Sequence, residues 1–245
     1  MKETDLVFDR TKHAIYTPKA KKVIQSLLRR DYPLEEAERL WEKIQLQYAA
    51  YLKDEPALGG LKLSAGVYDS ILVFAYYETV PKKPALEDIQ QEVYSIFMGG
   101  FDVLGKILNL NRRLDLKLAA KIFGVAMRTK AREAVMFPAS FHLGEGVSFD
   151  PKAGTIRYSF TQCPNAEYAK RHGLEHVLPL MCNCDHMALK KIHAGLIRCS
   201  TCTTGSVCDY CILGDWNPLM KNYTLVTDAN GLWLSQSVQE EETCI

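Results

Sequence analysis

The hydrophobic periodicity of the chain changes at Pro138. Before this point apolar residues recur every three to four positions, as they do along one side of an α-helix. After it, apolar and polar residues alternate on either side of a turn at residues 150–154, which is typical of a β-hairpin. A second pair of strands is expected over residues 196–202 and 207–213. The pattern predicts an α+β fold, in which an N-terminal helical layer packs on a small antiparallel β-sheet built from two hairpins with intervening helices.

Three regions follow from this pattern. Residues 1–137 form the helical region, residues 138–216 form the hairpin and helix region, and residues 217–245 are a C-terminal extension to which no pattern is assigned. No linker of suitable composition separates the regions, so one compact domain is expected. Helices are predicted over residues 18–30, 33–52, 64–80, 89–97 with a continuation to 108, 118–126, 165–171 and 178–193.

The overall composition limits the class of partner. Lys and Arg number 30 and Asp and Glu 29, which leaves a formal charge of +1 and no global field that would recruit nucleic acid or an anionic membrane. The longest apolar run, Ile71 to Tyr77, is far shorter than the roughly 20 residues of a membrane span. Residues 1–5 have no signal-peptide pattern. We therefore expect a cytoplasmic protein with a small-molecule substrate and no nucleic-acid or membrane partner. The sequence is compatible with a homo-oligomer as well as with a monomer.

The cysteines are distributed asymmetrically, because residues 1–162 contain none. In a reducing compartment such a cluster is more often reactive or metal-binding than a disulfide framework. The chemistry of the protein is therefore expected in the last third of the chain. The eight cysteines are Cys163, Cys182, Cys184, Cys199, Cys202, Cys208, Cys211 and Cys244.

Cys163 precedes a proline that is well placed as the first residue of a helix. As the N-cap of that helix, its thiol would meet unpaired backbone N–H groups and the positive end of the helix dipole. Both favour the thiolate, so Cys163 is a candidate nucleophile. A buried and unreactive N-cap cysteine is the competing interpretation.

Cys182 and Asp185 are three residues apart in a predicted helix, which places a thiol and a carboxylate on one face and turns Cys184 toward the core. The carboxylate can carry protons, but its charge alone would raise the pKa of the thiol. A cation or a helix start must therefore assist a nucleophilic Cys182. The candidate cationic residues are Arg171, His172, His176, His186 and Arg198.

In the last predicted strand, Cys208, Tyr210 and Ile212 share one face, and Asp209 and Cys211 lie on the other. Only one of these two cysteines can therefore face a common pocket. The spacing of residues 199, 202, 208 and 211 also invites a four-cysteine metal site. Five residues, however, are a short separation for two zinc knuckles.

Three segments, in this order, resemble the L-2-amino-thiazoline-4-carboxylic acid hydrolase family, which reads approximately Cys-Pro-x-x-x-Tyr, Cys-x-x-Asp and Gly-(few)-Cys-Asp-Phe. The resemblance covers roughly residues 86–213, and Tyr210 stands where the family usually has phenylalanine. It implies that Cys163, Cys182, Asp185 and Cys208 are catalytic and that Asp209 and Tyr210 contact the substrate. The matching segments are residues 163–168, 180–185 and 205–210.

The resemblance also implies a reaction, namely hydrolysis of a carbon–nitrogen bond in a cyclic amidine-like ring, which opens a 2-aminothiazoline carboxylate to a carbamoyl-cysteine. A thiolate of Cys163 or Cys208 would attack the ring carbon between the two nitrogens, Asp185 would carry protons, and a second thiol would assist. Arg198 or Arg157 would hold the substrate carboxylate.

Two other classes of function use the same residues. Cys163, Cys182 and Cys208 could bind a soft metal such as zinc, iron or mercury in an enzyme or a sensor. A Cys-x-x-Asp pair with a later cysteine is also similar to the arrangement in organomercurial lyases. The second class is a non-enzymatic module that binds a small molecule. No cofactor is assigned, and zinc or another soft metal stays the alternative.

Overall fold

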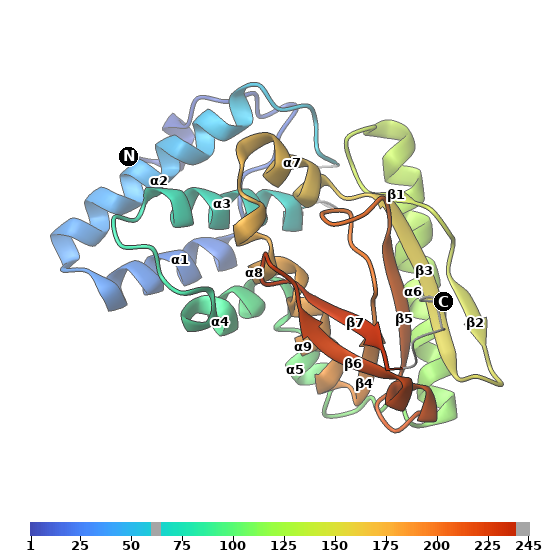
Figure 1. Ribbon diagram of the computed structural model, residues 1–245. Coiled ribbons are helices and arrows are strands. Elements are labelled where there is room, and N and C mark those ends of the chain that lie inside the picture. Colours follow the sequence, from blue (N-terminus) through green and yellow to red (C-terminus); the bar gives the residue numbers. More distant parts are fainter. Residues whose placement is uncertain (60–64, 239–245) are drawn as a thin grey trace.

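The computed structural model describes residues 1–59 and 65–238 (Figure 1). It has the α+β architecture that the change in periodicity predicts. A layer of helices from the N-terminal region lies beside an antiparallel sheet, and the remaining helices connect the strands. In the helical region the elements are η1(Glu3–Asp5), α1(Pro18–Asp31), α2(Leu34–Lys53), α3(Ala65–Thr79), α4(Leu86–Met98), α5(Phe101–Leu104) and α6(Arg113–Met136).

The main sheet has the strand order β1-β3-β5-β4, and β2 pairs with β3. Both predicted hairpins are present, as β2–β3 and β4–β5, although β4 ends at Ile197, five residues before the expected end. The central pair β3–β5 sets Tyr158 opposite Tyr210 and Phe160 opposite Cys208. The strands are β1(His142–Leu143), β2(Ser148–Asp150), β3(Thr155–Gln162), β4(Ala194–Ile197) and β5(Cys208–Gly214).

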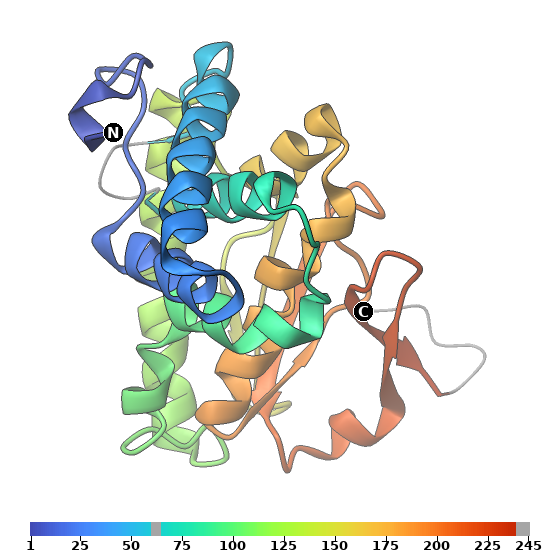
Figure 2. The same ribbon diagram turned by 90° about the vertical axis from the view of Figure 1, so that its left-hand side faces the viewer.

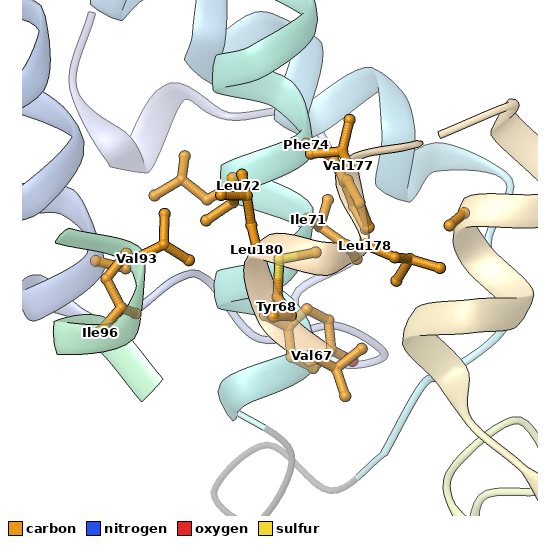
Figure 3. Packing of buried hydrophobic residues seen from close by; sticks show 14 of the residues in the cluster. Val67, Tyr68, Ile71, Leu72, Phe74, Val93, Ile96, Val177, Leu178 and Leu180 are labelled. Atoms are coloured by element: carbon orange, nitrogen blue, oxygen red, sulfur yellow. The ribbon is translucent and has the colours of Figure 1, made fainter. Parts of the chain in front are cut away.

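The helical layer packs around α3, which is buried on all sides along its centre. Residues 71–75 are completely buried, as their near-continuous apolar run predicts. Val177, Leu178 and Leu180 pack against this helix from the C-terminal region, and Val93 and Ile96 of α4 join the same cluster (Figure 3). The two regions therefore share one hydrophobic core. The predicted helix start at Ser64 lies outside the described residues.

The local signals at the ends of the helices are confirmed in two places. Thr17 caps α1, with its side chain accepting a hydrogen bond from the backbone N–H of Ala20. Cys163 is the N-cap of α7, and Pro164 is the first residue of that helix. In this part of the chain the helices are α7(Pro164–His172), η2(Glu175–Val177), α8(Pro179–Cys182) and α9(Cys184–Lys191).

The single helix predicted over residues 178–193 is wrong, because α8 ends at Cys182 and α9 begins at Cys184. The side chain of Asn183, which lies at the break, forms hydrogen bonds with the C-terminal extension. Its amide donates to the carbonyl of Gly231 at 3.0 Å, and its oxygen accepts from the backbone N–H of Trp233 at 2.9 Å. Tertiary hydrogen bonds thus join this break to a distant segment.

The helix predicted over residues 118–126 lies within the longer α6, but not all of its apolar side chains are buried. Phe123 faces inward, but Leu118 and Ile122 are 50% and 56% exposed. The helix runs along the sheet beside β1 and β2 (Figure 1). The helical continuation predicted up to residue 108 ends earlier, because α5 ends at Leu104 and the side chain of Ile107 is exposed.

The C-terminal extension contains η3(Pro218–Asn222) and a hairpin, β6(Tyr223–Thr227) and β7(Trp233–Ser237). Gly231 in its turn has a φ of 88°, a conformation that suits glycine. In Figure 2 this hairpin lies across the molecule from α1 and α2. It packs against β4 and the break at Asn183. In the ranges the structure covers, no helix has the length and apolar character needed to traverse a bilayer.

Candidate active site

A cavity of about 410 Å³ lies between the sheet and the surrounding helices. Residues from α3, α4, α5, α6, β3, α7, α8, α9 and β5 line it, so it is built by both halves of the chain. Its volume falls in the range typical of small-molecule sites. The lining residues are Gly66, Val67, Phe97, Met98, Phe101, Phe123, Met127, Lys130, Phe141, Tyr158, Phe160, Cys163, Asn165, Met181, Cys182, Asp185, Ala188, Leu189, Arg198, Cys208, Tyr210 and Ile212.

Three of the predicted cysteines line this one cavity. Cys163 reaches it from the start of α7, Cys182 from the end of α8, and Cys208 from the start of β5. Asp185 joins them from the first turn of α9, as its spacing from Cys182 predicts. Cys184, in contrast, is fully buried beside Tyr94.

Asp185 is held by two donors on a single oxygen. Its Oδ2 accepts a hydrogen bond from Nη1 of Arg198 at 3.0 Å and another from the hydroxyl of Tyr210 at 2.8 Å. Among the described residues, no donor contacts Oδ1, although Asp185 lines the cavity. One carboxylate oxygen is therefore fixed by the protein, and the other is available to a ligand.

Arg198 is 1% exposed and is the charged centre of the site. Its Nη2 donates to the carbonyl of Cys182 at 3.0 Å and to that of Trp233 at 3.4 Å. The backbone around it is bonded to Ser235 of β7. The C-terminal hairpin therefore helps to position Arg198, a role that the sequence analysis missed. Arg198 binds Asp185 and the carbonyl of Cys182, and its buried Nε has no hydrogen-bond partner among the described residues, so its role in holding a substrate carboxylate stays a prediction.

Burial determines the protonation of the thiols. It raises the pKa of Cys182 to about 11 and that of Cys208 to about 12, while the charge of Arg198 opposes both shifts. Burial also raises the pKa of Cys163 well above its usual range, with Cys182 adding to the shift, and the N–H of Ala166 at the helix start only partly opposes it. The helix start therefore does not outweigh burial at Cys163, and its role as the nucleophile stays a prediction.

Burial also raises the pKa of Asp185, against the lowering effects of Arg198 and Tyr210. A carboxyl group whose pKa is shifted upward is better suited to accept and return protons near neutral pH. Asn165 adds another polar group to the cavity. Its Oδ1 is buried, and in the described part of the chain it has no hydrogen-bond partner.

Several candidates lie elsewhere. Asp209 is on the opposite face of β5, where its carboxylate accepts the N–H groups of Cys199 and Ser200 at 3.0 and 2.6 Å. Cys211 packs in a second cluster behind the sheet. Arg157 of β3, the other arginine expected to bind the substrate carboxylate, does not line the cavity.

The other proposed cations are also engaged away from the cavity. Arg171 and His172 both pair with the buried Glu55, and the ring of His176 packs on Tyr77. His186 is not a lining residue, and burial lowers its pKa to about 3. Arg198 is therefore the candidate that the structure brings to the thiols.

The metal alternative has no ready-made ligand set. Within residues 1–59 and 65–238, no group of three or more His, Cys, Asp or Glu side chains is arranged to hold a metal ion. Cys163, Cys182 and Cys208 line one cavity without forming such a group. A soft-metal site stays a prediction that elemental analysis can test.

The family comparison supports the family that the sequence resembles. The family model described as L-2-amino-thiazoline-4-carboxylic acid hydrolase matches residues 65–212, which begins earlier than the resemblance read from the sequence and includes α3. A search of curated proteins and a search of solved structures each gave no match. Since the matched residues make up more than half of the chain and include all four predicted catalytic positions, the chain belongs to the L-2-amino-thiazoline-4-carboxylic acid hydrolase family.

Proposed function

We propose that the protein is a hydrolase that opens a carbon–nitrogen bond in a cyclic amidine. The observation that carries this proposal is that Cys182, Cys208, Asp185 and Arg198 line one cavity, with Arg198 bonded to Asp185. A cyclic amidine presents N–H donors on both sides of an electrophilic carbon. Oδ1 of Asp185 and Oδ1 of Asn165 are two acceptors without protein partners in the described residues, and they match this pattern of donors.

We assign the nucleophile to Cys182. Cys182 and Cys208 lie in the field of Arg198, which favours their thiolates, whereas Arg198 is not among the causes of the shift at Cys163. Of the two, Cys182 is the one whose backbone carbonyl Arg198 contacts, at 3.0 Å, and it lies three positions before Asp185 in the chain. A bound amidinium would add a second positive charge close to the thiol and lower its pKa further.

In the first half of the reaction, Asp185 accepts the thiol proton as Sγ of Cys182 bonds to the amidinium carbon. Asp185 then delivers that proton to the ring nitrogen, the carbon–nitrogen bond breaks, and the nitrogen leaves as an amine. The carbon stays attached to Cys182 as a cationic thioimidate. Arg198 and Tyr210 hold Asp185 in place during both proton transfers.

In the second half, water gives a proton to Asp185 as it adds to the same carbon. The bond to Cys182 then breaks as the added hydroxyl group becomes the carbonyl, and the proton that this hydroxyl loses passes to Sγ. The proton left on Asp185 passes to the new amine. The sum is amidinium plus water giving a carbamoyl group and an ammonium group.

The test is a ring-opening assay on 2-amino-2-thiazoline and related cyclic amidines, with product detected by mass spectrometry. We expect turnover by the wild type, with a loss of at least 100-fold in kcat/KM for Cys182→Ala and for Asp185→Asn. Cys211→Ala is the matched control, because this thiol lies behind the sheet. Full turnover in folded Cys182→Ala and Asp185→Asn would overturn the proposal.

Elemental analysis of the same samples tests the metal alternative. A metal-free protein with full activity supports the thiol mechanism. One zinc or iron per chain, with the cysteines of the cavity protected from alkylation, would contradict it.

A further inference from the structure

Tyr158 brings a second phenol hydroxyl to the cavity, beside that of Tyr210. The two residues are partners across the central strands β3 and β5, so their side chains lie on the same face of the sheet, and both line the cavity. The hydroxyl of Tyr210 donates to Oδ2 of Asp185 at 2.8 Å. The hydroxyl of Tyr158, in contrast, has no hydrogen-bond partner in the part of the chain that the structure describes. It is therefore available to a ligand.

The ring that carries this hydroxyl is held in place by its neighbours. Tyr158 stacks on Tyr210 with 4.6 Å between the ring centroids and 10° between the ring planes. Phe123 also stacks on Tyr158, at 5.9 Å, and Phe160 contacts it edge-on at 5.8 Å. A donor fixed in this way needs no reorganisation at the moment of reaction, which makes it effective at stabilising a transition state.

The hydroxyl of Tyr158 also keeps its proton. Burial raises its pKa well above the usual value, the charge of Asp185 adds to the shift, and the charge of Arg198 opposes it. Because both charged groups act on this pKa, the hydroxyl lies within the electrostatic reach of the Asp185–Arg198 pair. Tyr158 is therefore a neutral hydrogen-bond donor next to the reacting groups.

The reacting part of the substrate, an amidinium, offers this donor no oxygen to bind. Its nitrogens carry hydrogens on both sides of the central carbon, and Asp185 and Asn165 supply the matching acceptors. An oxygen acceptor appears only in the second half of the reaction, when water adds to the carbon attached to Cys182. A donor that finds its acceptor only at this stage stabilises the transition state more than the bound substrate.

We propose that Tyr158 is a further catalytic residue, whose hydroxyl donates a hydrogen bond to the oxygen that water adds to the thioimidate on Cys182 and that becomes the carbonyl of the product. The phenol proton stays on Tyr158 throughout, so the proton transfers through Asp185 and Sγ of Cys182 are unchanged. This inference rests on the proposed function and adds a group that acts in the second half of the reaction alone.

Rapid-quench mass spectrometry with 2-amino-2-thiazoline tests the step at which Tyr158 acts. Tyr158→Phe keeps the stacked ring and removes only the hydroxyl. We expect the initial rate of adduct formation on Cys182 to stay within about twofold of the wild-type rate. Steady-state turnover should fall about 100-fold, which is the loss typical of removing one oxyanion donor, and the adduct should accumulate.

Tyr77→Phe is the matched control, because this ring packs on His176 and does not line the cavity. It should leave both rates unchanged. Equal slowing of adduct formation and turnover in Tyr158→Phe, or turnover at the wild-type rate, would overturn the inference.

A second compound separates this role from binding of a substrate carboxylate. We expect Tyr158→Phe to slow turnover of 2-amino-2-thiazoline-4-carboxylate and of the unsubstituted ring to the same extent. A change in KM alone, or a loss confined to the carboxylate, would overturn the inference. A wild-type protein that forms neither adduct nor product contradicts the proposed function, and this inference with it.

Discussion

Replacing Arg198 with methionine tests the central electrostatic contact of the site. The change keeps most of the side-chain volume but removes a guanidinium that is 1% exposed and 3.0 Å from Asp185. Asp185 then keeps only the hydroxyl of Tyr210, and the carbonyl of Cys182 loses a donor. Removing one partner of a buried ion pair costs about 3–5 kcal/mol. For a chain of this size the expected loss in Tm is roughly 6–20 °C.

The pH dependence follows from the same contact. Because burial raises the pKa of Asp185 above its unfolded value, the folded state holds the proton more strongly, and stability falls as the pH rises through the interval between the two values. Loss of Arg198 removes an opposing effect and extends that interval upward. We therefore expect the deficit of Arg198→Met to be smaller at pH 4.5 than at pH 7.

Thermal and urea unfolding followed by circular dichroism provide the measurement. Adding Asp185→Asn to Arg198→Met removes the stranded charge, so the double variant should recover more than half of the lost stability. Lys190→Met, an exposed position on α9, is the control and should change stability by less than about 0.5 kcal/mol. A loss below about 1 kcal/mol for Arg198→Met, or no recovery in the double variant, would refute the reasoning.

Three further predictions concern the same site. Tyr210→Phe keeps the stack on Tyr158 but removes the 2.8 Å hydrogen bond to Asp185, which lowers the pKa of that carboxyl group. We therefore expect the acidic limb of the pH–kcat/KM profile to move to higher pH and stability to fall by only about 1 kcal/mol. An unchanged limb would argue against Asp185 as the proton carrier. Asn183→Ala removes both hydrogen bonds to the β6–β7 hairpin, and we expect the free energy of unfolding to fall by roughly 2 kcal/mol and hydrogen exchange in β7 to become faster. Unchanged exchange would show that the hairpin packs on the sheet without these bonds. Alkylation of Cys182 by iodoacetamide should rise about tenfold per pH unit from pH 7 toward its pKa of about 11; a plateau near pH 7 would contradict the burial of this thiol.

Local sequence signals predicted the parts of the site that depend on secondary structure alone. The spacing of Cys182 and Asp185 predicted that both face one site and that Cys184 lies in the core, and this holds although the two residues belong to the successive helices α8 and α9. Strand alternation likewise placed Cys208 and Cys211 on opposite faces of β5, and the family resemblance selected Cys208, which lines the cavity while Cys211 lies behind the sheet. These outcomes follow from the periods of the helix and the strand, which are fixed by backbone geometry.

Features that depend on tertiary contacts were not predicted. Arginine is rarely buried without a partner, so only the assembled site identifies Arg198 as the cation beside the thiols. The break at Asn183 depends on hydrogen bonds to residues about 50 positions later. The β6–β7 hairpin had a usable signal, because Asn230 and Gly231 form a turn pair between runs of strand-forming residues.

The most direct test of the account is to trap the covalent intermediate. The protein is mixed with a cyclic amidine, quenched in acid during turnover, and examined by intact-protein and peptide mass spectrometry. The account predicts a substrate-derived adduct on Cys182 that appears and decays with turnover in the wild type and is absent from Cys182→Ala. Steady turnover with no adduct on Cys182, or undiminished activity in Cys182→Ala, would contradict it.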